Sequence, residues 1–227
     1  MFAPAFPVYK SRFLKADRRI VVEAAGSHVY RTIFEQQARF DDVFLLPGAS
    51  CQGDAAGLAG QLLVLPIVGG ALLTTAQETD RALLPGCLYT IPAADVATCT
   101  FTNPFEHETV NLLLLYAAVP AAARATAVQE FQLPLTAKNV LVPTKNQALP
   151  AQVGVFDSRT KGTIAARSTG GFSLCYVLNG SFEIEDRLAE HRDALLLWET
   201  PTIEFEALSE TAILFYLEFA GAPPQLG

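Results

Sequence analysis

The side chains best suited to bind a metal ion or move a proton at neutral pH are three histidines, His28, His107 and His191. His107 stands between Glu106 and Glu108, and neighbouring residues cannot all point at one ion without a special turn, so this segment is predicted to be a loop. His191 lies in a polar connection, and His28 opens a strand with no partner nearby in sequence. We therefore predict no histidine-based catalytic or metal site.

Two pairs of glutamates, Glu183 with Glu185 and Glu204 with Glu206, have the spacing that places both members on one face of a strand. Carboxylates that are buried together can perform general acid–base chemistry. The residues between them and beside them are mostly apolar, which assigns the opposite face to the core. We therefore predict that both pairs lie on solvated outer faces and are not catalytic.

The four cysteines are far apart and form no Cys-x-x-Cys pair; they are Cys51, Cys87, Cys99 and Cys175. This spacing fits neither a zinc site nor a disulfide framework, and free thiols packed as small hydrophobic residues are typical of a cytoplasmic protein. No Gly-x-Ser-x-Gly motif and no phosphate-binding glycine loop is present. We expect a cytoplasmic protein with no cofactor.

Composition narrows the classes of partner. Hydrophobic residues make up 51% of the 227 residues and charged residues 17%, which predicts a folded globular chain. The net charge of −7 argues against nucleic acid, because phosphate binding needs a concentrated positive surface. No apolar run approaches the ~18 residues of a membrane helix, and the start of the chain lacks the pattern of a secretory signal.

The elements that must position any site are strands, and two stretches of the chain nearly repeat one another. Residues 62–70 and 173–181 are each an apolar strand that ends on a turn glycine, Gly69 or Gly180, and continues into a second strand. Further strands are expected at residues 28–34, 87–92, 97–103, 110–116, 152–157, 162–167, 194–198, 203–207 and 212–219. An alanine-rich segment at 117–129 is the best helix candidate, and a proline-rich stretch follows it.

Short strands at this density predict an all-β chain of two tandem jelly-roll barrels, joined by a short helical and proline-rich connector. We place the first barrel at residues 1–117, the connector at 118–150 and a second, degenerate barrel at 151–227.

This pattern resembles the cupin superfamily. Gly69, residues 84–86, residues 91–93 and Asn103 match its strand, Pro-Gly turn and Ile-Pro-Ala segments in order. Residues 101–106 and 176–183 are similar to the two-barrel pirin-like group, which is related to quercetin dioxygenase. The resemblance covers roughly residues 25 to 219, and it implies a two-barrel cupin fold.

The resemblance also implies where metal ligands would stand, because metal-using cupins hold iron, manganese or a similar ion with about three histidines and one glutamate inside the barrel. No histidine or glutamate occupies those positions here. In the first barrel they fall on Gln61, residues 55–57, and Val96 or Ala97; in the second they fall on Thr169, Gly170, Gly171, Phe172, and Thr202 or Ile203. We therefore predict that both barrels lack a metal site.

A ligand pocket would then be lined by whatever points inward. If Gln61 points into the first barrel, period-two alternation adds Leu63, Leu65 and Ile67, and Ala97, Cys99 and Phe101 face them from another strand. In the second barrel Phe172, Leu174, Tyr176 and Leu178 would point inward. The candidate pocket residues are Gln61, Leu63, Cys99, Phe101 and Tyr176, although side chains that simply fill the barrels explain the pattern equally well.

Three interpretations of function stay open. The first is a metal-free, pirin-like two-barrel protein that binds a small apolar ligand or a protein partner and has no dioxygenase activity. The second is a quercetin dioxygenase-like oxidoreductase with a non-standard site, which needs a metal ion or a buried acid–base group. The third is self-association through an exposed apolar face, and the chain alone is compatible with a monomer or a homodimer.

Overall fold

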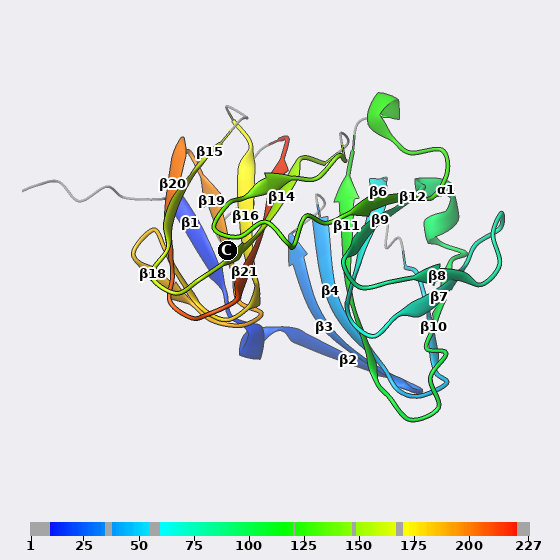
Figure 1. Ribbon diagram of the computed structural model, residues 1–227. Helices are drawn as coiled ribbons and strands as arrows, with labels where there is room; N and C mark the ends of the chain where they lie inside the picture. Colours follow the sequence, from blue (N-terminus) through cyan, green and yellow to red (C-terminus); the bar gives the residue numbers. More distant parts are fainter. Residues whose placement is uncertain are drawn as a thin grey trace, which may run out of the picture. The chain divides into compact units, whose positions relative to one another are not determined.

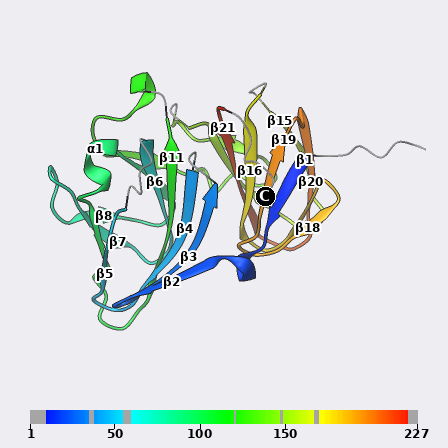
Figure 2. The ribbon, with the colours of Figure 1, turned by 180° about the vertical axis from the view of Figure 1, so that it is seen from behind.

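The computed structural model describes residues 10–34, 38–54, 60–119, 121–146, 149–166 and 170–221. These residues form two compact units made almost entirely of antiparallel strands (Figures 1 and 2). We call the unit built around residues 19–133 and 144–148 the first barrel, and the other unit the second barrel. The prediction of an all-β chain with two barrels is therefore confirmed. No helix in the described part of the chain is long and apolar enough to cross a membrane.

The first barrel consists of two sheets around one core. Its seven-stranded sheet has the order β12 (Gln129–Gln132), β9 (Cys87–Ile91), β6 (Gly60–Val68), β11 (Val110–Ala118), β4 (Ala38–Leu45), β3 (Ser27–Phe34) and β2 (Ile20–Ala24). Its four-stranded sheet has the order β5 (Ser50–Gln52), β10 (Thr100–Thr102), β7 (Ala71–Thr74) and β8 (Arg81–Leu83). A short helix α1 (Ala93–Val96) and a 3-10 turn η2 (Ala121–Ala123) complete the unit.

The second barrel repeats this plan with a six-stranded and a four-stranded sheet. The larger sheet has the order β1 (Lys10–Leu14), β19 (Ala194–Trp198), β16 (Phe172–Asn179), β21 (Ala212–Phe219), β14 (Ala151–Phe156) and β13 (Val142–Pro143). The smaller sheet has the order β15 (Lys161–Ala165), β20 (Thr202–Ala207), β17 (Phe182–Ile184) and β18 (Arg187–Ala189). A 3-10 turn η1 (Ala16–Arg18) follows β1.

Local sequence explains most of these strands. The central strands β6 and β11 are nearly continuous runs of buried apolar residues, as expected for strands covered on both faces. Gly69 and Gly180 end their strands with φ of +67° and +75°, a conformation that glycine adopts at no steric cost. The nearly repeated strand–glycine segments therefore occupy equivalent places in the two barrels.

The N-terminal strand belongs to the second barrel. We expected residues 1–117 to form the first barrel, but β1 pairs with β19, with Lys10 opposite Trp198 and Leu14 opposite Ala194. Phe13 packs against the second core. The Nζ of Lys15 then binds Asp193 Oδ2 at 2.8 Å. The strand that completes this sheet therefore comes from the far end of the chain.

The segment 118–150, which we expected to be a helical and proline-rich connector, consists mainly of strands and turns that belong to the two barrels. The helix predicted at 117–129 is wrong, because β11 continues to Ala118 and the single turn η2 is the only helical element among the described residues that follow it in this segment. Within 118–150, β12 is added to the edge of the first barrel's larger sheet, and β13 pairs with β14 in the second barrel. High alanine content favours a helix only weakly, and pairing with an available sheet edge overrides that preference.

Candidate functional site

The interior of the first barrel is a packed core. Cys99 and Phe101 lie in it as predicted, both fully buried. The predicted orientation of β6 is wrong, however, because Leu62 and Val64 belong to this core, which places Gln61 and Leu63 on the opposite face of the sheet. Both faces of this strand are apolar, so the alternation carries no signal for which face is inside.

Gln61 has a structural contact rather than a place in the barrel interior. Its Oε1 accepts a hydrogen bond from the backbone N–H of Ala125 at 3.3 Å. Gln61 also borders a cavity of about 10 Å³ together with Gly60, Val96, Tyr116 and Ala117. That volume holds about one water molecule, so this position offers no room for an organic ligand.

The first barrel contains a cluster of ion pairs that the sequence analysis did not predict. Arg39 is 2% exposed, and its guanidinium lies 3.9 Å from the centre of the Tyr116 ring. Its Nε is 3.1 Å from Asp41 Oδ2 and its Nη1 is 3.0 Å from Asp54 Oδ2. Arg31 donates two hydrogen bonds of 2.9 Å to the same Asp41 carboxylate. Two arginines therefore balance two aspartates, and the spacing Arg39-x-Asp41 within a strand was the signal that could have revealed them.

The thiols near this cluster are not reactive. Burial raises the pKa of Cys51 to about 12 and the pKa of Cys99 to about 11. Because the thiolate is the form that attacks electrophiles and binds metal ions, protonated thiols at neutral pH do neither readily. The first barrel therefore contains buried polar groups that hold one another and no activated nucleophile among its cysteines.

The donor groups present do not fit the metal site that the cupin resemblance implies. Among the described residues, no three His, Cys, Asp or Glu side chains gather so that they could hold a metal ion. His107 is 90% exposed and His28 is 46% exposed, beside Glu23. Residues 55–57 and Thr169, which stand at four of the implied ligand positions, lie outside the described residues; they are alanine, alanine, glycine and threonine. The sequence at these positions offers no imidazole or carboxylate ligand.

The core of the second barrel also ends in buried polar groups, but these are hydroxyls and one carboxylate without an arginine. Cys175 and Tyr216 belong to this core, so Tyr176 points to the opposite face of β16 and its predicted inward orientation is wrong. Ser173 is the next residue before Cys175 that points to the inner face of β16. It pairs with Leu197 on β19 and with Glu218 on β21. Ser173 and Glu218 are each 5% exposed.

These polar groups form a directed chain of hydrogen bonds. The Tyr216 hydroxyl donates to Glu218 Oε1 at 2.7 Å. The Ser173 and Tyr216 hydroxyl oxygens are 2.9 Å apart. A phenol has one proton to donate, so Ser173 must be the donor to Tyr216. Among the described residues nothing donates to Ser173 Oγ, so its lone pairs can accept a hydrogen bond from another molecule.

A cavity of about 250 Å³ lies at Ser173, and we call it the Ser173 cavity. It contains Gly170 and Gly171, two of the positions that the cupin resemblance assigns to metal ligands. Its remaining lining residues come from β16, from β19 and the turn after it, and from the end of β15; they are Ala166, Ser173, Leu197, Trp198, Glu199, Thr200 and Pro201. The Ser173 cavity is therefore a partly apolar site lined by two buried hydroxyl residues, Ser173 and Thr200, of which Thr200 donates its proton to the backbone carbonyl of Trp198.

The electrostatics keep this chain of hydrogen bonds neutral at its centre. Burial raises the pKa of Tyr216 well above its usual range, and the hydrogen bond to Glu218 raises that pKa as well. Tyr216 is therefore a protonated phenol at neutral pH, and it cannot act as a base that would activate Ser173. This arrangement suits the binding of a polar group better than nucleophilic catalysis.

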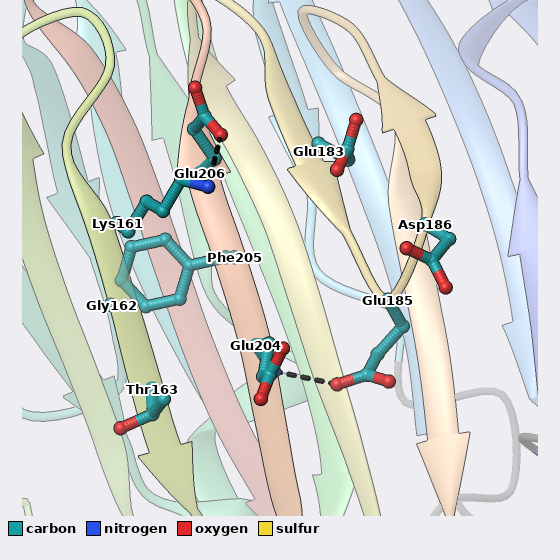
Figure 3. Close-up of a pocket in the computed structure, with 9 residues that line it drawn as sticks. All are labelled: Lys161, Gly162, Thr163, Glu183, Glu185, Asp186, Glu204, Phe205 and Glu206. Atoms are coloured by element: carbon teal, nitrogen blue, oxygen red, sulfur yellow. Dashed lines mark hydrogen bonds and ion pairs between the residues drawn. The ribbon is translucent and has the colours of Figure 1, made fainter. Parts of the chain in front are cut away.

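An acidic groove of about 510 Å³ lies on the outer face of the smaller sheet of the second barrel (Figure 3). Glu183 and Glu204 are exposed there, as predicted for a solvated face. Glu206 binds Lys161 Nζ at 3.3 Å, and this hydrogen bond lowers the pKa of Glu206. Glu185 departs from the prediction, because it is only 4% exposed and its Oε1 accepts the backbone N–H of Glu204 at 2.6 Å. The groove therefore contains solvated or paired carboxylates and no buried acid–base pair.

No protein-family model and no curated protein matches the sequence. Solved structures do match over nearly the whole chain. Bacterial pirin YhhW from Escherichia coli, solved in complex with nickel(II), is 13% identical with a TM-score of 0.75, covering 95% of this chain and 100% of that chain. Ylba from E. coli is 13% identical with a TM-score of 0.69, covering 95% and 93%. Quercetin 2,3-dioxygenase from Acinetobacter baumannii is 14% identical with a TM-score of 0.65, covering 95% and 79%.

Identities this low establish a shared fold and leave activity open. They confirm the fold that the resemblance implied, since pirin and quercetin dioxygenase are among the proteins matched. The chain therefore has the fold of the cupin superfamily, in its two-barrel form.

Proposed function

We propose that this protein is a pirin-like, metal-free binding protein, and that the Ser173 cavity takes a small, largely apolar molecule that carries a hydrogen-bond donor. The observation that supports this most is the direction of the hydrogen bonds from Ser173 to Tyr216 and from Tyr216 to Glu218. That direction leaves an acceptor at the cavity, so a ligand hydroxyl or N–H group would complete the chain. Apolar walls and a few placed polar groups are typical of small-molecule sites.

The size of the Ser173 cavity suits a single ring or a short branched chain. A dry cavity of about 150 Å³ is enough to hold benzene, and the Ser173 cavity measures about 250 Å³. Leu197 and Trp198 supply apolar surface at its wall. A small aromatic or aliphatic alcohol, or an amine of the same size, matches both the volume and the acceptor.

Binding is a better account than dioxygenation. The oxidoreductase interpretation needs a metal ion or a buried acid–base group, and the donor set of the described residues does not fit a metal ion. Burial raises the pKa of Tyr216, so its hydroxyl stays protonated near neutral pH and cannot serve as a general base. We further propose a cytoplasmic location, because all four cysteines are free thiols, as a reducing compartment favours.

Phenol and toluene test the acceptor directly, because they share a shape and differ in the donor group. We expect phenol to bind about five- to tenfold more tightly than toluene. This ratio of dissociation constants corresponds to the free energy of one net hydrogen bond. The substitution Ser173→Ala should abolish that preference while retaining toluene binding. Isothermal titration calorimetry measures both affinities, and Ser158→Ala in the same barrel is the matched control. Equal affinities in the natural protein, or an unchanged preference in Ser173→Ala, would contradict the proposal.

The metal content of the protein is a separate prediction. Purified, untagged protein grown with iron, manganese, nickel and zinc available should contain less than about a tenth of an equivalent of any of them, because the multi-histidine set that retains transition metals is missing. Elemental mass spectrometry measures this, with a cupin that has an intact histidine site purified in parallel. Near-stoichiometric metal would overturn the metal-free part of the proposal and return His28, His107 and the glutamates to consideration.

A further inference from the structure

A pocket of about 660 Å³ in the first barrel is lined by two cationic side chains, Arg124 and Lys145, and we call it the Lys145 pocket. Its walls come from three segments: the end of turn η2 with the two residues after it, strand β12, and residues 145–146. All three segments belong to the same compact unit. The volume falls within the roughly 300–1,000 Å³ that is usual for small-molecule sites.

Hydrogen bonds attach two of these segments to the outer face of the larger sheet. Tyr89 and Ile91 of β9 belong to the core, so Thr90 between them faces outward. Asn146 Nδ2 donates to Thr90 Oγ1 at 3.1 Å. Gln61, on that same outer face, accepts the backbone N–H that follows η2. The Lys145 pocket therefore lies over the outer face of the sheet, away from the barrel core.

The carboxylate of Glu130, the only acidic residue among the described residues that line the pocket, is directed away from it. Glu130 lies opposite Tyr89, and directly opposed side chains share a face, so it points to the core side of the sheet. Its Oε1 accepts a hydrogen bond from Gln132 Nε2 at 3.1 Å, and its Oε2 lies 3.6 Å from Arg81 Nη2. This carboxylate is therefore neutralised on the far side of β12.

The two cations remain on the pocket side. Lys145 is exposed, and no carboxylate within the described part of the chain pairs with it. Arg124 is half-buried, and its Nε donates to the backbone carbonyl of Val119 at 3.2 Å, which holds the guanidinium at the wall. A concave surface that carries one sign of charge attracts ligands of the opposite sign. The pocket therefore favours an anion.

We propose that the Lys145 pocket binds an organic carboxylate with an aromatic or branched aliphatic body. Arg124 and Lys145 would hold the carboxylate by charge-assisted hydrogen bonds, which are shorter and stronger than neutral ones. The preferred ligand differs in charge from the neutral donor that suits the Ser173 cavity. The inference does not depend on that cavity, which lies in the second barrel.

The neighbouring side chains favour an organic acid over a bare inorganic anion. Gln129 and Phe131 lie opposite Thr90 and Leu88 of β9, so both point to the outer face. The Phe131 ring supplies apolar surface beside the cations, together with the alanines of η2, and the Gln129 amide can donate a further hydrogen bond. Inorganic phosphate would use the cations and leave this apolar wall uncovered.

Titration calorimetry of the full chain with 2-naphthoate and 2-naphthamide tests the charge, because the two share a shape and only naphthoate is an anion at neutral pH. Naphthoate should bind about tenfold more tightly, as expected for hydrogen bonds to charged groups. This preference should shrink as salt is added. Two fused rings exceed the single ring that suits the Ser173 cavity, so Ser173→Ala should leave the naphthoate affinity unchanged.

The substitution Lys145→Met locates the site. It removes the charge and keeps an unbranched stem, so naphthoate affinity should fall about tenfold. Thermal unfolding should stay near that of the natural chain, because no ion pair is lost. Lys145→Arg should retain the affinity. Lys161→Met is the matched control, since Lys161 is also exposed, changes the net charge by the same amount and lies in the second barrel.

Three results would each overturn the proposal. Naphthoate could bind no more tightly than naphthamide, which would remove the role of charge. Lys145→Met could bind naphthoate as well as the natural protein does, which would place the anion elsewhere. Inorganic phosphate at equal concentration could displace naphthoate, which would show that the cations bind any anion and that the apolar wall contributes nothing.

Discussion

Replacing Arg39 by methionine is expected to lower the free energy of unfolding of the first barrel by about 3 kcal/mol or more, the cost of breaking a buried ion pair by removing one partner. Arg39 is almost fully buried, contacts the carboxylates of Asp41 and Asp54, and stacks on Tyr116. Methionine retains part of the apolar stem and loses the charge, so Asp41 keeps only Arg31 as its cation.

The measurement is urea-induced unfolding followed by circular dichroism, with Arg159→Met as the matched control. Arg159 pairs with Glu206 at 3.3 Å, but its side chain is 80% exposed. Exposed ion pairs contribute little to stability because water screens the charges, so the control should unfold almost as the natural protein does. The double variant Arg39→Met with Asp41→Asn should recover part of the loss, because it removes the uncompensated charge. A loss at Arg39 as small as that at Arg159 would show that the cluster is not stabilising.

Deleting residues 1–14 is expected to destabilise the second barrel strongly, although those residues stand at the opposite end of the sequence from most of it. The deletion removes β1 and its pairing with β19. It also removes Phe13 from the edge of the second core, a loss of about 2 kcal/mol by itself. We expect the shortened chain to unfold at lower urea concentration than Phe13→Ala in the full chain, which in turn unfolds below the natural protein.

The same deletion should weaken phenol binding. Leu197 of β19 lines the Ser173 cavity, and its partner on the neighbouring strand β1 is Ser11. Without β1, β19 becomes the edge of the sheet and the wall of the cavity loses its support. Calorimetry with phenol measures this effect, and a shortened protein with natural stability and affinity would show that β1 is dispensable.

Strands and their turns could be predicted from the sequence because their signals are local. The expected strands at 194–198 and 212–219 coincide with β19 and β21, the one at 28–34 lies within β3, and the one that ends on Gly69 is β6. Each is a run of β-branched, aromatic or apolar residues bounded by turn residues. The cupin resemblance rested on the same kind of signal, since a turn glycine or a Pro-Gly pair reports the conformation of its own backbone.

The orientation of the strands could not be predicted in the same way. Residues 61–65 are apolar or uncharged throughout, and so are residues 172–178, so a shift of one residue reverses which side chains face the core without changing the pattern. For this reason Gln61, Leu63 and Tyr176 were assigned to the wrong face. Cys99 was assigned correctly, because polar Thr98 and Thr100 flank it and show the alternation.

The two polar clusters depend on contacts between distant segments. Ser173 and Tyr216 are 43 positions apart, and only the register of β16 against β21 brings their hydroxyls to 2.9 Å. Arg39 lies on β4 and Asp54 follows β5 in the other sheet, so their contact depends on how the two sheets of the first barrel face each other. The barrel to which β1 belongs is also decided by pairing, because a five-residue strand has no preference for one edge over another until the sheet exists. The amino-acid sequence therefore specifies the all-β barrels, the missing metal ligands and the thiols through local residue types. Strand register and sheet closure, which act over long separations, assemble the Ser173 cavity, the buried ion pairs and the Lys145 pocket.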